Sequence, residues 1–422
     1  MSKVHLPKGM RDLLPQNMLR RNLVLQKIKT IFETFGFLPL ETPAMERKET
    51  LMGKYGDEGS KLIFKILARG EAGKRGETDL ALRYDLTVPL ARVVAMNPSL
   101  NLPFKRYQIQ PVWRADRPQK GRFREFYQCD VDIVGTDNIL AETECITIVH
   151  HALKSLGFTQ FTIRLNDRRL LRAMVASIDA LEQEFQILGA LDKLDKIGKE
   201  GVRNDLLKLG LQEAQIQKLF TQLDGGEIEG SESTDIEAAL EDIRQKSIQM
   251  GVDPKCVQLD RTLARGLDYY TGPVFETILH DANIGSVSGG GRYDGLIGMF
   301  SGRDIPAVGV SLGLERLLVI LEEREGAEKI VGTQVWVTVF NKDLEQYSLQ
   351  VARKLRESGI KTDVSFKSNK LSKQFKEAHK RHIPHVVVIG PDDVETGHIQ
   401  WKNMTTGEQK TCLVEELIEA LR

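Results

Sequence analysis

Apolar residues recur at helical spacing near the start of the chain, in residues 17–35, at Leu19, Leu23, Ile28, Ile31, Phe32 and Phe35. This spacing predicts an amphipathic opening helix, and Gly36 is its predicted stop. The next stretch, FLPLETPAM, is strand-like but contains two prolines. Proline cannot donate a hydrogen bond within a sheet, so this strand is predicted to lie at an edge.

Strand-like segments then follow one another closely: LALRYDL, FKRYQIQPVWR, FREFYQCDVDIVG, VFETILH and SVSGGGRYD. A predicted helix over 141–156 precedes a further strand, FTQFTIRLND. Several strands in near succession, two of them joined by a short basic loop, indicate an antiparallel sheet flanked by helices. The predicted fold class is therefore α+β.

Two changes of pattern divide the chain. From about residue 168 the sequence is rich in Leu, Lys, Glu and Gln, with scattered glycines, which predicts a helical insertion over about 168–255. After a polar stretch at 322–329, strands and helices alternate to the end, as in α/β domains. We therefore predict a main domain over 1–325 that contains the insertion, and an α/β domain over 331–422.

The composition is that of a globular protein. The chain has 422 residues, of which 41% are hydrophobic and 28% charged, and no apolar run long enough to cross a bilayer. The first residues, MSKVHLPKGMRDLLP, resemble neither a signal peptide nor a transit peptide, so a cytoplasmic location without membrane association is expected. The four cysteines form no CxxC pair, which argues against a disulfide framework or a zinc site.

Local charge indicates a partner that the net charge conceals. The formal net charge is zero, yet residues 101–124 carry seven Lys or Arg against the single acid Asp116. Residues 361–382 carry seven against Asp363 and Glu377. Either run alone is typical of a solvated face. Two such runs in different predicted domains favour a polyanionic partner.

The sequence lacks the usual phosphate-binding loops. It has no GxxxxGK[ST] motif, and the glycine cluster at 289–295 has Asp294 in place of the third glycine of GxGxxG. A nucleotide would therefore need positive side chains for its phosphates. Three arginines are candidates because the guanidinium fork grips phosphate oxygens and keeps its charge: Arg114, Arg265 and Arg316. Each arginine taken alone is more typical of a surface residue or an ion pair.

Four segments carry a resemblance to a known family. LARGLDYYTGPVFE, SGGGRYDGL, WRADRPQKGRFREFYQCDVDIVG and AVGVSLGLERLL resemble the active-site motifs of class II aminoacyl-tRNA synthetases, specifically those of the histidyl-tRNA synthetase family. The resemblance covers nearly the whole chain. It implies ATP-dependent activation of L-histidine, aided by Mg²⁺, and transfer to tRNA(His). It also implies a homodimer whose partner covers the proline-containing edge strand, an insertion that contacts the acceptor arm, and a C-terminal anticodon-binding domain.

The resemblance also implies roles in ATP and tRNA binding. Arg114 would hold the α-phosphate, Glu125 and Phe126 would lie near the adenine, and Arg316 would meet the γ-phosphate. Arg265 would align the histidine carboxylate with the α-phosphate. The basic hairpin loop would touch the tRNA acceptor end through Arg117, Gln119 and Lys120. Small residues would let one strand approach the base, or could reflect tight strand packing: Gly309, Ser311 and Gly313.

Histidine binding needs acceptors for an ammonium group and polar partners for an imidazole. By resemblance, Asp85, Thr87 and Gln128 hold the α-amino group, and Asp132 and Tyr270 contact the imidazole. Tyr269 is a further candidate. Two alternatives stay open: Asp85 could be a turn or cap residue, and alternation could place Asp130 and Asp132 on a solvated face. Where the familiar bacterial pattern reads RPEGT this chain reads RYDLT, which shortens the acid at Asp85 by one methylene.

Two rival functions follow from the same fold. A non-catalytic paralogue, such as the regulatory subunit of ATP phosphoribosyltransferase, would sense histidine without charging tRNA. It predicts loss of the phosphate-binding arginines and of the C-terminal domain. A simple tRNA-binding or signalling module is the second rival, and histidine-dependent pyrophosphate exchange would discriminate against it.

Overall fold

The computed structural model describes residues 4–54, 59, 61–228, 231–264, 269–325, 330–367 and 370–422. By contact the chain divides into two compact units. One consists of Met1–Asp12 with Leu23–Arg324, and the other of Leu13–Asn22 with Glu325–Arg422. The boundary at Arg324 falls inside the polar stretch that the sequence marks as a linker. The ten residues from Leu13 to Asn22 belong to the second unit, which the sequence pattern did not indicate.

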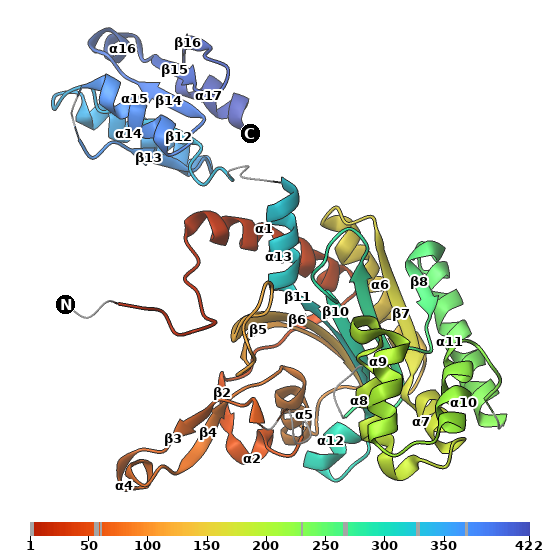
Figure 1. The fold of residues 1–422 in the computed structure, drawn as a ribbon. Helices are drawn as coiled ribbons and strands as arrows, with labels where there is room; N and C mark the ends of the chain where they lie inside the picture. The colour runs from red at the N-terminus through yellow and green to blue at the C-terminus, as the bar shows by residue number, and fades with distance from the viewer. Residues whose placement is uncertain are drawn as a thin grey trace. The chain divides into compact units, whose positions relative to one another are not determined.

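A large sheet forms the centre of the first unit (Figure 1). In the described residues its strands are, in sheet order, β1 (Leu38–Pro39), β5 (Phe104–Trp113), β6 (Glu125–Val134), β11 (Ala307–Gly313), β10 (Ser288–Arg292), β9 (Pro273–Leu279), β7 (Phe161–Asp167) and β8 (Val257–Leu259). Neighbours are antiparallel through the centre, as predicted. The two outermost pairs, β1 with β5 and β7 with β8, are parallel. FLPLETPAM is not one strand as predicted, because only Leu38–Pro39 (β1) and Met45, at the start of β2 (Met45–Arg47), are extended in sheets. Strand β1, with its proline, does lie at an edge, as predicted.

Strand β6 shows how the sheet acquires one apolar and one polar face. Successive side chains of a strand point to opposite faces. One set is buried in the main hydrophobic core beside helix α6 (Leu140–Ser155): Cys129, Val131 and Ile133. The other set lines a cavity on the opposite face: Gln128, Asp130 and Asp132. The apolar face anchors the strand, so the polar face is held in a fixed position.

Helix α1 (Pro15–Thr34) confirms the predicted opening helix. Its buried side chains include Val24, Ile28 and Phe32, which join the core under the large sheet. Leu23, expected on the apolar face, is 53% exposed. The register of the helix therefore turns Val24 inward instead of its neighbour.

A small sheet and several helices complete the first unit outside the insertion. The small sheet has the order β2 (Met45–Arg47), β4 (Thr78–Leu82) and β3 (Lys65–Leu67). The first three residues of LALRYDL are therefore in a strand, as predicted, but this strand belongs to the small sheet. The other four residues lie outside any strand and precede α5. The helices are α2 (Lys48–Leu51), α4 (Gly70–Lys74), α5 (Thr87–Met96), α12 (Asp294–Ser301) and α13 (Leu314–Glu325).

The region predicted to be a helical insertion is helical in the structure and lies beside β7 and β8 (Figure 1). Its elements are α7 (Arg168–Ala176), η1 (Leu181–Gln183), α8 (Glu184–Leu191), α9 (Leu194–Lys208), α10 (Glu213–Leu223), α11 (Ser231–Gln249) and η2 (Pro254–Cys256). Gly198 breaks the helical backbone within α9, with φ 67° and ψ 175°. The first helices of this region reach the cavity described below.

The second unit is an α/β domain, with a central sheet of parallel and antiparallel strands. In the described residues the sheet order is β13 (Thr362–Val364), β12 (Val335–Val337), β14 (His385–Val388), β15 (Ile399–Asn403) and β16 (Gln409–Cys412). Its helices are α14 (Glu345–Glu357), α15 (Leu371–Lys380), α16 (Pro391–Thr396) and α17 (Val414–Leu421). Helices α14 and α17 pack in one apolar cluster, and α15 in another. The two helical layers therefore cover opposite faces of the sheet.

The α+β class predicted from the sequence is confirmed, with an α/β domain at the C-terminus. The short helix α16 was not predicted. Its six residues are too few for apolar periodicity to be recognised. In the described part of the chain, no helix combines the length and the apolar content needed to cross a membrane.

Candidate active site

A single cavity of about 1170 Å³ collects most of the side chains singled out in the sequence. The polar faces of β6, β10 and β11 form part of its wall. Among the predicted site residues, those that line it are Asp85, Thr87, Arg114, Phe126, Gln128, Asp132, Tyr269, Tyr270 and Arg316. These residues come from segments more than 200 positions apart, so the fold assembles the site from separate motifs.

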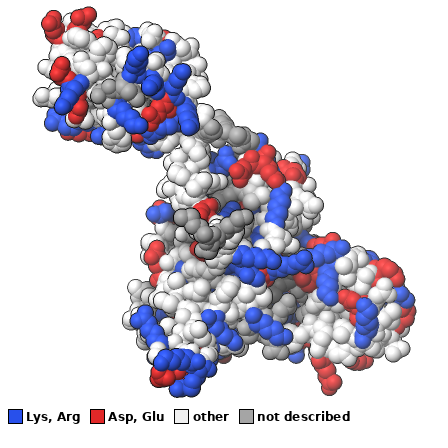
Figure 2. Space-filling model, turned by 60° about the vertical axis from the view of Figure 1, so that its left-hand side comes forward, with Lys and Arg blue, Asp and Glu red and all other residues white. Residues whose placement is uncertain are grey.

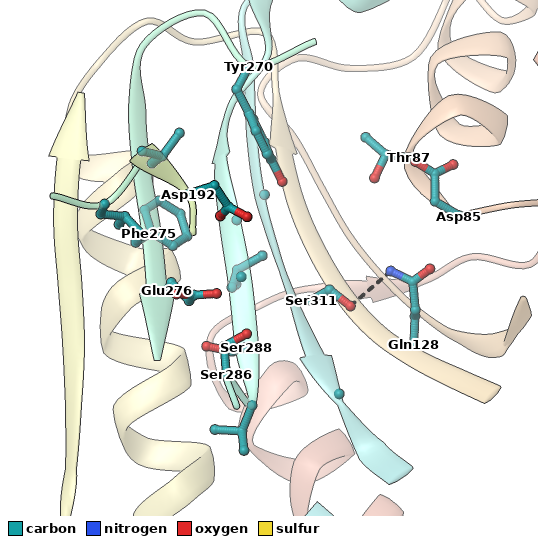
Figure 3. Close-up of a pocket in the computed structure, with 18 of the residues that line it drawn as sticks. Asp85, Thr87, Gln128, Asp192, Tyr270, Phe275, Glu276, Ser286, Ser288 and Ser311 are labelled. Atoms are coloured by element: carbon teal, nitrogen blue, oxygen red, sulfur yellow. Dashed lines mark hydrogen bonds between the residues drawn. The ribbon is translucent and has the colours of Figure 1, made fainter. Parts of the chain in front are cut away.

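Figure 3 shows two groups of polar side chains facing each other across this cavity. Asp85, Thr87 and Gln128 lie on one side, where Gln128 donates a hydrogen bond from Nε2 to the Ser311 hydroxyl at 3.1 Å. On the other side lie Asp192, Glu276, Ser286 and Ser288, and the ring of Tyr270 projects between the two groups.

Asp132 is held by buried partners. Its carboxylate forms an ion pair with Arg106 at 2.7 Å, and the two side chains are 3% and 0% exposed. The hydroxyl of Tyr293 donates a hydrogen bond to the same carboxylate. Asp130, two residues earlier on the same face of β6, is also buried. The alternative that Asp130 and Asp132 lie on a solvated face is therefore wrong.

The glycine opposite Asp132 explains part of the small-residue pattern in β11. Gly309 pairs with Asp132 across the strands, and a Cβ atom on Gly309 would lie 2.0 Å from the Asp132 carboxylate oxygen. No side chain fits there. Ser311 has a different role, since its hydroxyl meets Gln128. At Gly309, at least, tight packing of neighbouring strands requires the small residue.

Burial of this acidic wall changes its titration. Burial raises the pKa of Asp130 to about 7, against the lowering effect of Arg106. The pKa of Asp132 is raised for the same reason, and Arg106 and the Tyr293 hydroxyl oppose the rise. Desolvation disfavours the charged form of a carboxyl group, and a nearby cation restores part of that loss. Near neutral pH, the wall can therefore gain or lose one proton at Asp130.

Asp85 supports the start of a helix and also lines the cavity. Its carboxylate accepts a hydrogen bond from the backbone N–H of Val88 at 3.1 Å, at the start of α5. It also accepts one from the Tyr269 hydroxyl at 3.2 Å. Leu86 is the N-cap residue of α5, so Asp85 supports the first turn of the helix from the position before the cap, and this contact does not exclude a binding role. The Tyr269 and Tyr270 rings pack edge to face, with centroids 5.0 Å apart.

Aromatic faces and backbone carbonyls position the arginines of the cavity. Arg114 donates from Nε to the Tyr84 carbonyl at 3.0 Å, and its guanidinium lies 4.3 Å from the Tyr84 ring centroid and 5.2 Å from that of Phe126. Arg316, on α13, donates to the Ser286 carbonyl. Both side chains line the cavity, where a guanidinium group can form charge-assisted hydrogen bonds to an anion.

Some predicted residues lie away from the cavity. Glu125 is exposed and does not line it. The hairpin residues predicted to contact tRNA are exposed as well: Arg117, Gln119 and Lys120. Gln119 pairs through its backbone with Arg122, and Lys120 forms an ion pair with Glu323 at 2.5 Å. Arg265 lies outside the described residues.

The structure adds residues that the sequence reasoning missed. From the insertion, the cavity receives Arg168, Phe185, Asp192, Lys193 and Lys196. Glu276 and Ser288 come from β9 and β10, and Glu315 precedes Arg316 on α13. Alternation along VFETIL could have indicated the polar face at Glu276. No local sequence pattern could have indicated the insertion residues, because their position in the cavity wall depends on the packing of α8 and α9.

The cavity could accept a divalent cation only together with its ligand. Within the described ranges, no three His, Cys, Asp or Glu side chains cluster closely enough to hold a metal ion. Mg²⁺ commonly binds through one or two carboxylates and the phosphates of a nucleotide. Glu276 and Asp192 supply carboxylates of that kind in the cavity wall.

Comparison with known proteins gives the same result for both units. The family model described as Histidyl-tRNA synthetase matches residues 9–317, and the one described as Anticodon binding domain matches residues 334–422. A histidine–tRNA ligase from Cytophaga hutchinsonii is 39% identical over 455 aligned residues, covering 100% of both chains.

Solved structures show the same fold. The crystal structure of histidyl-tRNA synthetase from Nostoc sp. PCC 7120 matches with a TM-score of 0.85 and 31% identity, covering 100% of both chains. A structure from Bacillus halodurans, described as an ATP phosphoribosyltransferase regulatory subunit/histidyl-tRNA synthetase, matches with a TM-score of 0.74. It is 24% identical and covers 88% of this chain and 96% of that one, which indicates a shared fold alone. The family model spans most of the chain and a curated relative matches it end to end, so the chain belongs to the histidyl-tRNA synthetase family.

Proposed function

We propose that this chain activates L-histidine with ATP and transfers it to tRNA(His). The observation that carries the proposal is the pairing of two unlike walls in one cavity. A buried acidic wall contains Asp85, Asp130 and Asp132, and an arginine wall contains Arg114 and Arg316. The first suits a cationic amino acid, and the second suits the phosphates of a nucleotide.

Histidine would bind against the acidic wall. Asp85, Thr87 and Gln128 lie on the same side of the cavity, where they can accept the α-ammonium group (Figure 3). Asp132 and Tyr270 would contact the imidazole. A pocket built to pair with imidazole nitrogens rejects an amino acid that lacks them, because its buried polar groups would then be left without partners.

ATP would bind along the arginine wall. Arg114 would hold the α-phosphate, Phe126 would stack near the adenine, and Arg316 would reach the γ-phosphate. A carboxylate oxygen of histidine then bonds to the α-phosphorus as the bond to the bridging oxygen breaks, which releases diphosphate. Both reactants are anions, so the arginines lower the barrier by neutralising charge. We assign Arg265 to align the carboxylate. Bound with the nucleotide, Mg²⁺ would add further positive charge.

Transfer to tRNA would use surfaces outside the cavity. A band of Lys and Arg side chains crosses the middle of the first unit (Figure 2). The exposed hairpin residues Arg117, Gln119 and Lys120 would contact the acceptor end, and the insertion would hold the acceptor arm. A ribose hydroxyl of the tRNA then attacks the histidyl carbonyl, and AMP leaves.

The second unit would bind the anticodon. Phe366 is 95% exposed just after β13, and three exposed lysines follow it in the sequence: Lys367, Lys370 and Lys373. An exposed aromatic ring amid positive charge is suited to stacking with an unpaired base. We further propose that the enzyme acts in the cytoplasm as a homodimer, with edge strand β1 at the interface, since its Leu38 is 63% exposed.

The regulatory paralogue remains the second candidate, but two observations count against it. It predicted the loss of phosphate-binding arginines, and Arg114 and Arg316 both line the cavity. It also predicted the loss of the C-terminal domain, and residues 334–422 match an anticodon-binding domain.

The test is ATP–pyrophosphate exchange by the purified full-length chain, with each amino acid in turn, beside an Arg265→Ala variant. We expect exchange with histidine alone and a large loss in the variant. Histidine binding by calorimetry without any exchange would overturn the ligase proposal and favour the regulatory paralogue. Exchange without charging of tRNA(His) would contradict the tRNA step alone.

A further inference from the structure

The segment from Gly9 to Arg11 packs against the hairpin that borders the arginine wall. The Gly9 carbonyl accepts a hydrogen bond from the backbone N–H of Arg124 at 2.8 Å. Gly9 has φ +83°, and a Cβ atom there would lie 2.7 Å from the Pro118 side chain and 2.9 Å from that of Arg124. This close approach requires glycine. The segment is therefore fitted to the hairpin and does not merely pass over it.

Arg11 then joins this hairpin to helix α13. Its guanidinium lies 3.8 Å from the ring centroid of Phe123 and forms an ion pair with Glu315. The Glu315 side chain is only 4% exposed, whereas that of Arg11 is 32% exposed. Glu315 also accepts a hydrogen bond from the backbone N–H of Tyr127 in β6 at 3.4 Å. One carboxylate thus links the N-terminal segment, the hairpin strand and the helix that carries Arg316.

Arg11 offsets the negative charge of Glu315, a buried carboxylate in the wall of the nucleotide cavity. Glu315 lines the same cavity as Arg114 and Arg316, and Arg11 does not. A buried carboxylate without a counter-charge is costly, and it would attract the guanidinium groups that a phosphate needs. Arg11 pairs with it from outside the cavity. The negative charge of Glu315 is thereby offset before an anionic ligand enters the cavity beside Arg114 and Arg316.

We propose that Arg11 is a positioning residue for the ATP-dependent step. It neutralises Glu315 and fixes the hairpin and α13 relative to each other, so that Arg114 and Arg316 are held ready for phosphates. It makes no contact with substrate. This inference rests on the proposed function, because it assigns ATP to the cavity.

The test compares Arg11→Met with the wild type and with Lys8→Met, a charge loss in the same segment at an exposed residue. We expect Arg11→Met to raise KM for ATP in the exchange reaction by about tenfold or more. This is the size of one charge-assisted hydrogen bond to phosphate, which is lost if a cavity arginine turns toward Glu315 instead. KM for histidine should change little. Calorimetry of ATP binding without histidine should show the same loss, and Lys8→Met should match the wild type.

Two further variants separate positioning from a simple loss of folding. Arg11→Lys keeps the charge without the planar fork, so it should recover part of the ATP affinity. Arg11→Met combined with Glu315→Gln also removes the negative charge that Arg11 offsets, and should recover ATP affinity relative to Arg11→Met. An unchanged KM for ATP in Arg11→Met would overturn the inference, as would equal losses in KM for ATP and for histidine. If the wild type itself shows no exchange but binds ATP, the proposed function fails, and the calorimetric comparison still tests Arg11.

Discussion

The two walls of the cavity use opposite strategies to hold charge. On the acidic wall, Asp132 is almost fully buried, and Arg106, itself inaccessible, is its counter-ion. On the arginine wall, Arg114 and Arg316 are partly exposed. Arg114 contacts the Tyr84 carbonyl and ring, and Arg316 contacts the Ser286 carbonyl. Buried charges need full compensation, whereas partly hydrated ones do not. We therefore expect substitutions in the acidic wall to change mainly the stability of the fold. Substitutions in the arginine wall should change mainly ligand binding.

Loss of Arg106 should have the largest effect. Arg106→Met leaves Asp132 buried without its counter-ion, which we expect to lower the free energy of unfolding by about 3–5 kcal/mol. Urea denaturation would measure this loss. The matched change Arg75→Met breaks an ion pair with Glu77 whose two side chains are 63% and 55% exposed, and should cost no more than about 1 kcal/mol. Equal losses in the two variants would contradict the contrast between the walls.

Loss of Arg316 should reduce activity strongly and stability little, the opposite of what we expect for Arg106. We expect Arg316→Ala to lower kcat/KM for pyrophosphate exchange by roughly 100-fold or more, since a preorganised cation is removed from the developing charge. Its unfolding midpoint should move little. Arg316→Lys should recover part of the rate because the charge remains. A variant that loses stability in proportion to activity would show that Arg316 is part of the fold and not of the ligand site.

Gly309 offers a test of packing on the acidic wall. In Gly309→Ala the new methyl group meets the Asp132 carboxylate, and we expect a loss of about 1–3 kcal/mol in stability together with weaker histidine binding. Gly295→Ala is the control, because a Cβ atom there has no neighbour within 4 Å and Gly295 does not line the cavity. Thermal unfolding and histidine calorimetry of both variants would check this. Indistinguishable variants would mean that β11 can shift to relieve the contact.

The smallest expected effect is on the pH dependence of folding stability, through Asp130. The pKa of Asp130 is raised in the folded chain to about 7, so between pH about 4 and about 7 the folded state holds a proton that the unfolded state has lost. This group therefore destabilises the fold as pH rises through that window, and Asp130→Asn should flatten the dependence. Facing Asp130 are Arg106, Asp132, Asp85 and the Ser311 hydroxyl.

Ionisation of Asp130 should strengthen histidine binding as pH rises, although it destabilises the fold. Above pH about 7 an ionised Asp130 adds negative charge to the acidic wall, so KM for histidine should fall modestly. The imidazole of free histidine also titrates near this pH, and Asp130→Asn separates the two contributions. If wild type and variant show the same pH profile for KM, Asp130 does not titrate in this range.

The sequence predicted the fold better than it predicted the contacts of the site. Strands β5, β6, β9 and β10 and the alternating C-terminal elements follow from local periodicity and appear in the structure. Nine of the proposed site residues line one cavity, and Glu125 does not. The ambiguity over Asp130 and Asp132 shows the limit. Alternation places both on the same face of β6, but it cannot say whether that face meets water or a buried cavity.

The sequence by itself determined the period of each element, the class of the fold and the arginine and carboxylate types that nucleotide and histidine binding require. These depend on neighbours within a few positions. Only the tertiary structure decided which carboxylate forms an ion pair with which arginine. Asp132 pairs with Arg106 across adjacent strands, and Arg11 meets Glu315 across 304 positions of sequence. Such pairings arise from the register of strands and the packing of helices, and they set burial, which in turn sets the cost of each charge.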